Sequence, residues 1–280
     1  PPVKGANVRH AGNDVTQDTL LLQSGHQLGP FDLAWLSACG ISQVNVRKKA
    51  RVAFFSTGDE LREPGEDLAP GQIYDSNREV VRQLLKAMPV EVSDLGVIAD
   101  DPGAIEHVLG AAAANHDLLL TSGGVSVGTA DYMKDVVQKL GSLDLWRLNL
   151  KPGKPLAFGR IDESLFLGLP GNPVSTVVTF LLIAQPAILA LAGCTSEKPP
   201  LLIPATFRGS IRHSPGREEY QRGNLEITPR GAEVRATGEQ ASNRLASFSN
   251  ANCLIRIRKQ SGNLEDGAAV EVLLFKGLLG

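Results

Sequence analysis

The stretch that decides the fold is DLLLT at residues 117–121, followed by SGGVSVG at 122–128. The apolar DLLLT segment has the length and composition of a short buried strand. The glycine- and serine-rich segment after it leads into a predicted helix over residues 130–140. A buried strand joined through a short polar loop to a helix is typical of α/β proteins. This unit therefore predicts an α/β domain with a mostly parallel sheet.

Strands and helices alternate on both sides of this unit. The other segments predicted to be extended are 51–56 (RVAFFS), 91–98 and 143–150. The other predicted helices cover 77–88, a segment that starts at 102, and a long run from 173. Asp101 and Pro102 are residue types preferred at the N-cap and first position of a helix, which places that start. The pattern predicts a three-layer α/β domain over residues 50–194.

The two flanking regions differ from this domain. Residues 1–49 are too few for a core of their own, and they predict a partial N-terminal domain with a short helix at 31–38 and a short strand at 43–47. We expect missing residues or another chain to complete it. Residues 195–280 lose the helical period and predict a small C-terminal all-β domain. Its period-2 runs are 225–228, 233–236, 253–258 and 269–275.

Composition limits the classes of function. Of 280 residues, 42% are apolar and 21% charged, which excludes a disordered chain or a coiled coil as a global description. The formal net charge of −2 argues against a general nucleic-acid binder. Cys39, Cys194 and Cys253 are scattered without a CxxC pair, so we expect reduced thiols in a cytoplasmic protein rather than disulfides or a zinc site.

The apolar run at residues 173–193 has transmembrane length. Gln185 and Pro186 interrupt its middle, and no basic cluster flanks it. We therefore expect a buried helix of the α/β domain, kinked at Pro186, and no membrane partner.

Acidic residues follow three successive predicted strands. Glu60 follows the first, Asp100 the second, and Asp131 the glycine-serine loop after the third. Ligands of parallel sheets bind at the carboxyl ends of strands, where these groups would converge. Capping and surface solvation explain each carboxylate singly about as well as a site does. Their joint placement favours a site for a divalent metal and a phosphate or another oxyanion.

Three loops are candidates for holding that anion. The loop SGGVS, with Ser122, Gly123, Gly124 and Ser126, leads into a helix, where backbone N–H groups can bind an anion. KPGKP places Lys151 and Lys154 on a stiff turn, and PGNPVS brings Asn172 and Ser175 to the start of the long helix. Turn chemistry alone explains the prolines and glycines, but it does not require two lysines. Nucleophilic catalysis is not indicated, because GxSxG is absent and the five histidines fall outside these loops.

The motifs TSGGVSVGTADY, KPGKPLAFG, GLPGNPVS, STGDEL and QIYDSN together resemble the molybdopterin molybdenumtransferase family, the MoeA type related to the E domain of gephyrin. GANVRHAGNDV and PGREEYQRG also fit, so the resemblance covers the whole chain. It implies insertion of molybdenum from molybdate into adenylylated molybdopterin, with Mg²⁺ and release of AMP. It also implies a homodimer with a shared active site. Family members carry a further N-terminal region, so we expect this chain to be the later two-thirds of a longer protein.

The resemblance also assigns roles to residues. Asp131, Glu60 and Asp100 match acidic positions of the family's active site, and Asp131 and Glu60 would hold the metal. The residues that would bind substrate groups are Asp14, Ser122, Gly123, Gly124, Ser126, Lys151, Lys154, Asn172 and Ser175.

Two other functions remain open. The SGG loop is shared with the molybdopterin adenylyltransferases, although the additional β domain and residues 1–49 argue against that activity. The relation to gephyrin allows a non-catalytic scaffold or binding module. A molybdopterin adenylyltransferase and other cofactor-biosynthesis proteins are the expected partners.

Overall fold

The structure of the chain is a computed structural model that describes residues 3–124, 132–194 and 201–275. The chain divides into two compact units, and each is described by itself. The first holds residues 3–47 with 193–194, and the second holds residues 48–192 and 201–275.

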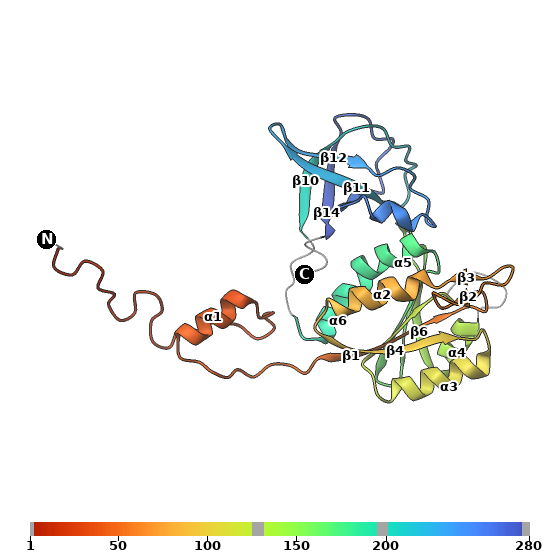
Figure 1. Cartoon of the computed structure of the whole chain (residues 1–280), viewed down its shortest axis with the longest axis horizontal. Coiled ribbons are helices and arrows are strands. Elements are labelled where there is room, and N and C mark those ends of the chain that lie inside the picture. The colour runs from red at the N-terminus through yellow and green to blue at the C-terminus, as the bar shows by residue number, and fades with distance from the viewer. Residues whose placement is uncertain (1–2, 125–131, 195–200, 276–280) are drawn as a thin grey trace. The chain divides into compact units, whose positions relative to one another are not determined.

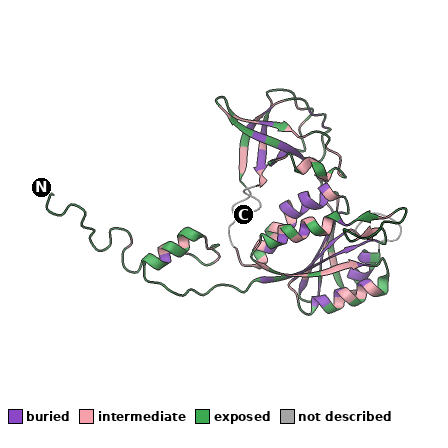
Figure 2. Cartoon of the chain, in the orientation of Figure 1, coloured by how far each residue is buried: buried purple, intermediate pink, exposed green. Residues whose placement is uncertain are grey.

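The N-terminal unit contains one helix, α1 (Pro30–Ala38), as the sequence predicts. The Asp32 carboxylate accepts a hydrogen bond from the Gly29 N–H at 2.7 Å and so satisfies a backbone group at the helix start. The predicted strand at 43–47 is wrong: residues 41–49 form no regular element. The reason is that the described residues of this unit, 3–47 and 193–194, offer the segment no neighbouring strand to pair with. Within residues 3–47 only Leu36 is buried (Figure 2).

The larger unit is built around a six-stranded sheet (Figure 1). Its strands, in spatial order, are β4 (Val90–Ile98), β1 (Ala50–Thr57), β5 (Leu118–Ser122), β9 (Ser164–Leu169), β8 (Pro155–Ile161) and β6 (Gly141–Arg147). The first four strands pair in parallel, and β8 pairs antiparallel with both of its neighbours, β9 and β6. This confirms the mostly parallel sheet. The hairpin of β8 and β9 is an element to which the sequence analysis assigned no strands.

Helices cover both faces of this sheet (Figure 1). Val52 and Phe54 of β1 pack in one core with α2 (Ser76–Lys86) and α5 (Pro173–Thr179). Ala53 and Phe55 of the same strand pack in a second core with α3 (Pro102–Ala113) and α4 (Tyr132–Leu140). Successive residues of a strand point to opposite faces, so the apolar residues of one strand supply both cores. The three-layer architecture is confirmed.

The predicted start of α3 is also confirmed. The Asp101 side chain accepts a hydrogen bond from the Ala104 N–H at 2.8 Å, and Pro102 occupies the first helical position. An N-cap carboxylate satisfies a backbone donor that has no partner within the helix.

The long apolar run forms α5, a π-helical segment (Phe180–Ala184) and α6 (Gln185–Leu191). It is long and apolar enough to cross a membrane by length and composition alone. Val174, Val178 and Ile188 are nevertheless fully buried in the core of the α/β domain. At the predicted kink, the Gln185 N–H bonds to the Phe180 carbonyl five residues back, directly before Pro186, which has no N–H to donate.

The C-terminal region is a small β-barrel. Its strands are β10 (Leu202–Phe207), β11 (Glu218–Thr228), β12 (Gly231–Ala236), β13 (Cys253–Ile257) and β14 (Ala269–Leu274). β12 pairs with both β10 and β11, which closes the sheet around a core that includes Phe207 and Ile255. The short strand β7 (Leu150–Lys151) of the α/β domain adds to β11 in parallel. The barrel is thereby joined to the loop that carries Lys151.

Candidate functional site

Three carboxylates meet where β1 and β4 end. Asp59 and Glu60 follow β1, and Asp100 follows its neighbour β4. The Asp100 N–H donates to the Asp59 carboxylate at 3.2 Å. Partial burial raises the pKa of Asp100, and the negative charges of Asp59 and Glu60 raise it further. We call these three residues the acidic edge, which brings together the predicted Glu60 and Asp100.

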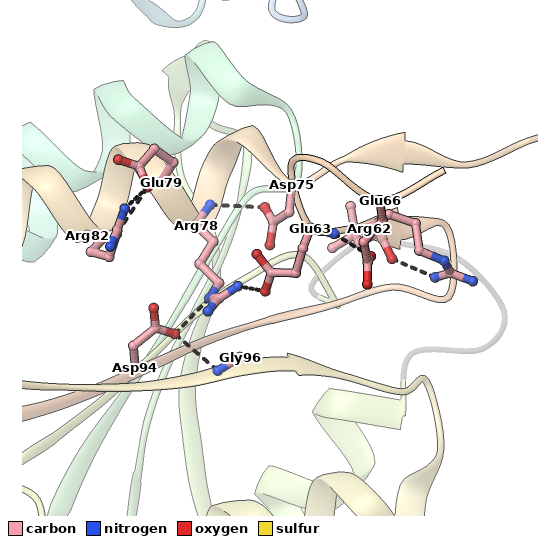
Figure 3. A network of polar contacts seen from close by, with 10 residues as sticks. Arg62, Glu63, Glu66, Asp75, Arg78, Glu79, Arg82, Asp94 and Gly96 are labelled. Carbon is pink, nitrogen blue, oxygen red and sulfur yellow. Dashed lines mark hydrogen bonds and ion pairs between the residues drawn. The ribbon is translucent and has the colours of Figure 1, made fainter. Parts of the chain in front are cut away.

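A polar network fixes the loop that carries Glu60. The Glu60 carbonyl accepts from the Ile73 N–H at 2.9 Å, next to the short pair of β2 (Leu61–Arg62) and β3 (Ile73–Tyr74). Arg78 of α2 ion-pairs with Glu63 and, at 2.7 Å, with Asp94 of β4 (Figure 3). One guanidinium thus ties the segment after Glu60 to the strand that leads to Asp100. Its forked donors suit two carboxylates at once.

The two described glycines of the SGGVS loop pack against the end of β1. Gly123 has φ +89°, and a Cβ there would lie 2.7 Å from the Thr57 carbonyl oxygen. Gly124 has φ +65°, and its Cβ would lie 2.5 Å from the Thr57 hydroxyl oxygen. Glycine is therefore required for this close approach. Ser122 is buried at the end of β5, whereas Ser126 and Asp131 lie outside the described residues.

Buried polar atoms without hydrogen-bond partners gather near the same strand ends. Among the described residues, the hydroxyls of Thr57 and Thr121, at the ends of β1 and β5, have no hydrogen-bond partner. At the start of α2, Asp75 uses one carboxylate oxygen to cap the helix, and its other oxygen is buried with no partner in the described part of the chain. Buried polar groups are normally paired with protein or water. These atoms are consistent with a polar ligand or ordered water at this end of the sheet.

A second region lies between the α/β domain and the barrel and is strongly basic. A cavity of about 510 Å³ is lined by four predicted residues: Lys151, Lys154, Asn172 and Ser175. The barrel contributes Arg212, Arg217, Glu219 and Arg222 to the same wall. Five cations against one carboxylate make this basic cavity an anion-binding environment. The structure thus brings together the four residues expected to hold an oxyanion.

The pairing of β7 with β11 positions Lys151. It places Lys151 opposite Glu219, and the Lys151 ammonium lies 3.0 Å from the Glu219 carboxylate. Glu219 is almost completely buried, and its other oxygen accepts from Gln221 at 2.9 Å. The carboxylate therefore restrains a half-exposed lysine at the mouth of the basic cavity.

The acidic edge and the basic cavity adjoin through two loops. A Cβ on Gly171 would lie 3.8 Å from the Cα of Gly123, because β5 and β9 are neighbouring strands. The Gly171 carbonyl also accepts from the Asn77 side chain at 2.6 Å. The next residue, Asn172, lines the basic cavity. A substrate with both a metal-binding and an anionic group could therefore contact both regions.

The structure does not support the predicted place of Asp14 in the site, nor does it show a metal-binding cluster among the described residues. Asp14 is exposed in the N-terminal unit, which is described by itself, so the structure does not bring it to either region. Among the described residues, no group of three or more His, Cys, Asp or Glu side chains is arranged to hold a metal ion. The carboxylates of the acidic edge are nevertheless the hard oxygen ligands that Mg²⁺ prefers, and their mutual repulsion is what a cation would relieve.

Known proteins match the chain over its whole length. Residues 53–190 match the family described as a probable molybdopterin binding domain, and residues 204–275 match the MoeA C-terminal region. The molybdopterin molybdenumtransferase of Haemophilus influenzae is 41% identical over 280 residues, covering 100% of this chain and 69% of the relative. This chain belongs to the molybdopterin molybdenumtransferase family.

Further relatives and a solved structure are also similar to nearly the whole of this chain. The molybdopterin molybdenumtransferase of Nostoc is 34% identical over 97% of this chain and 64% of its own length. Gephyrin of Dictyostelium discoideum is 31% identical over 96% of this chain and 42% of its own length. A crystal structure of a molybdopterin biosynthesis MoeA protein from Pyrococcus horikoshii superposes with a TM-score of 0.79 and 31% identity, over 94% of this chain and 64% of that protein. The chain thus spans about two-thirds of most of these relatives.

The barrel supplies residues that the sequence analysis did not assign to this site. Arg217, Glu219 and Arg222 lie in PGREEYQRG, which was noted only as a motif shared with the molybdopterin molybdenumtransferase family. His213 also lies here, with its ring nitrogen 3.8 Å from Glu219, in a second cavity of about 410 Å³. The high density of charged residues in this motif could have pointed to the site, because it holds two arginines and two glutamates in nine residues.

Proposed function

We propose that this chain inserts molybdenum from molybdate into adenylylated molybdopterin and releases AMP. The observation that carries the proposal is the basic cavity, which combines Lys151, Lys154 and Ser175 beside the glycine loop. Tetrahedral oxyanions such as molybdate are bound by ammonium, guanidinium and hydroxyl donors. Family membership then selects molybdate among such anions.

In this mechanism the basic cavity and the acidic edge bind different groups of the reactants. Lys151 and Lys154 bind and orient molybdate in the basic cavity, and Glu219 keeps Lys151 in place. Glu60 and Asp100, with Asp131 by resemblance, would hold Mg²⁺, which supplies charge neutralisation for the pyrophosphate when bound. The SGG loop faces the phosphate side of the pterin. One molybdate oxygen attacks the phosphorus of the AMP group, the phosphoanhydride bond to the pterin phosphate breaks, and AMP leaves with that oxygen. The two dithiolene sulfurs bind molybdenum, and their two thiol protons leave with a second molybdate oxygen as water. Positioning and charge then contribute most of the rate.

The test is reconstitution of molybdenum cofactor from adenylylated molybdopterin and molybdate, with and without Mg²⁺. We expect cofactor and AMP in equal amounts, a requirement for Mg²⁺, and no product from Asp131→Ala with its fold intact. Wild-type turnover by that variant would contradict the assignment.

The alternative functions give different products in the same assay. An adenylyltransferase would convert molybdopterin and ATP without a partner enzyme, and a scaffold would use neither substrate. No feature of the described residues favours either function.

We further propose that the chain acts in the cytoplasm as a homodimer with a shared active site. Support comes from the N-terminal unit, where Val3, Leu20 and Phe31 are more than 70% exposed. Apolar side chains in so small a unit suit burial against a second chain. Light scattering on the purified chain tests the dimer, and complex formation with a molybdopterin adenylyltransferase can be measured in the same way.

A further inference from the structure

Arg222 is the largest fully buried side chain of the described residues. It lies on β11 with none of its surface exposed. Its guanidinium donates to the Ser247 hydroxyl at 2.8 Å and to three successive backbone carbonyls at 3.2–3.3 Å. Those carbonyls belong to Glu239, Gln240 and Ala241. One side chain therefore holds a whole turn of backbone in place.

The segment 239–242 forms part of the basic cavity. Gln240, Ala241 and Ser242 line it, and the Gln240 side chain bonds back to the Arg222 backbone on both its N–H and its carbonyl. The Ser242 carbonyl accepts from the Val174 N–H at 3.0 Å, directly before Ser175. Arg222 thus connects the barrel, through this segment, to the helix that carries Ser175.

The charge of Arg222 has no close counter-ion. All its hydrogen-bond acceptors are neutral, and among the described residues no carboxylate lies within ion-pair distance. Burial lowers the pKa of Arg222 to about 10, against the opposing effect of Glu219, so the guanidinium is still charged at neutral pH. The Phe248 ring, whose centroid lies 5.8 Å from the guanidinium carbon, compensates this buried charge only in part. An anion in the adjoining cavity would compensate the rest.

We propose that Arg222 is a positioning residue that also sets the charge preference of the basic cavity. It holds segment 239–242 against α5, and its buried charge favours a doubly charged tetrahedral oxyanion over a singly charged one of similar shape. Because no part of Arg222 is exposed, it acts on the anion through space and through the segment, not by contact. The inference rests on the proposed function, which places molybdate in this cavity.

Two variants separate the two roles. Arg222→Met removes the positive charge and keeps much of the side-chain volume. Arg222→Lys keeps the charge but loses the guanidinium N–H donors that bond to the three carbonyls. Arg208→Met is the matched control, because Arg208 is a partly buried arginine of the same barrel that pairs with Glu233 and Asp266 and does not line the cavity. Calorimetry on the whole chain compares molybdate, a dianion, with perrhenate, a monoanion.

The expected results follow from Coulomb's law, under which a dianion loses twice the interaction energy of a monoanion. For Arg222→Met we expect the molybdate Kd to rise about tenfold and the perrhenate Kd about threefold. Arg222→Lys should keep the ratio of the two affinities while hydrogen exchange of the amides in segment 239–242 becomes faster. Arg208→Met should change neither the ratio nor that exchange.

The outcomes distinguish the two proposals. Failure of the wild-type chain to bind either anion overturns the proposed function. Wild-type binding with unchanged affinities and exchange in both Arg222 variants overturns only the inference. If Arg222→Met does not fold, Arg222→Lys decides, because loss of the molybdate preference with the charge retained contradicts the charge role. Unchanged exchange in that variant contradicts the positioning role.

Discussion

The acidic edge and the basic cavity adjoin, yet they are built differently. The acidic edge consists of exposed carboxylates on two loops of one domain, and its only internal contact is one backbone hydrogen bond from Asp100 to Asp59 among the described residues. The basic cavity combines two domains and includes the buried side chains of Ser175, Glu219 and Arg222. The difference indicates that buried contacts fix the side chains of the basic cavity in place, whereas like charges at the acidic edge oppose one another.

The largest effect is expected at the acidic edge. Glu60→Gln should lower the rate of cofactor formation about 100-fold, because a neutral amide is a weaker ligand for the proposed Mg²⁺ than a carboxylate. The molybdate Kd should not change, since Glu60 does not line the basic cavity. Steady-state rates and calorimetry measure the two quantities. A loss of molybdate affinity in this variant would contradict separate binding roles for the acidic edge and the basic cavity.

The second prediction concerns Gly123, which lies between the acidic edge and the basic cavity. Gly123→Ala should cost about 2 kcal/mol of unfolding free energy, because the residue has positive φ and its Cβ would meet the Thr57 carbonyl. Gly110→Ala in α3 is the control, since nothing lies within 4 Å of its added Cβ. That change should stabilise the chain by up to about 1 kcal/mol. Urea unfolding compares the two, and equal stabilities would contradict the packing of the loop on β1.

In the basic cavity, Lys151→Ala should raise the molybdate Kd about tenfold through loss of one charge-assisted contact. Lys139→Ala provides the control, because Lys139 pairs with Glu106 at 2.7 Å on helices outside the cavity. Calorimetry should show no change for the control. Equal effects of the two variants would show that only net charge matters.

The smallest effect concerns Asp100. Its pKa is raised in the fold, so the native state disfavours the ionised form, and this cost appears as pH rises above the unfolded value of 3.8. Asp100→Asn does not titrate and should raise Tm by about one degree at neutral pH. The gain should vanish near pH 3 and shrink when Mg²⁺ is added to both proteins. A lower Tm for the variant at neutral pH would contradict repulsion at the edge.

The sequence predicted local features well. The apolar RVAFFS and DLLLT segments and the Asp101-Pro102 cap lead directly to β1, β5 and α3, because neighbouring residues determine them. Glu60 and Asp100 were predictable for the same reason, since each follows its own strand, whereas Asp59 was not among the predicted site residues. Asp131 and Ser126 stay predictions, because they lie outside the described residues.

Long-range pairing was not predictable in this way. Glu219 lies 68 residues after Lys151, and only the addition of β7 to β11 brings them together. The segment 43–47 shows the converse, since its strand-like composition finds no partner strand in its unit. Arg217 and Arg222 of the cavity wall were therefore missed although their motif was noticed, and Arg212 lies outside that motif.

We expect the oxyanion to bind in the basic cavity and not at the acidic edge. Anomalous diffraction from crystals soaked in tungstate tests it directly, because tungstate replaces molybdate with the same shape and charge. We expect a strong anomalous peak from tungsten beside Lys151, Lys154 and Ser175. A peak near Glu60 and Asp100, with none in the basic cavity, would contradict it.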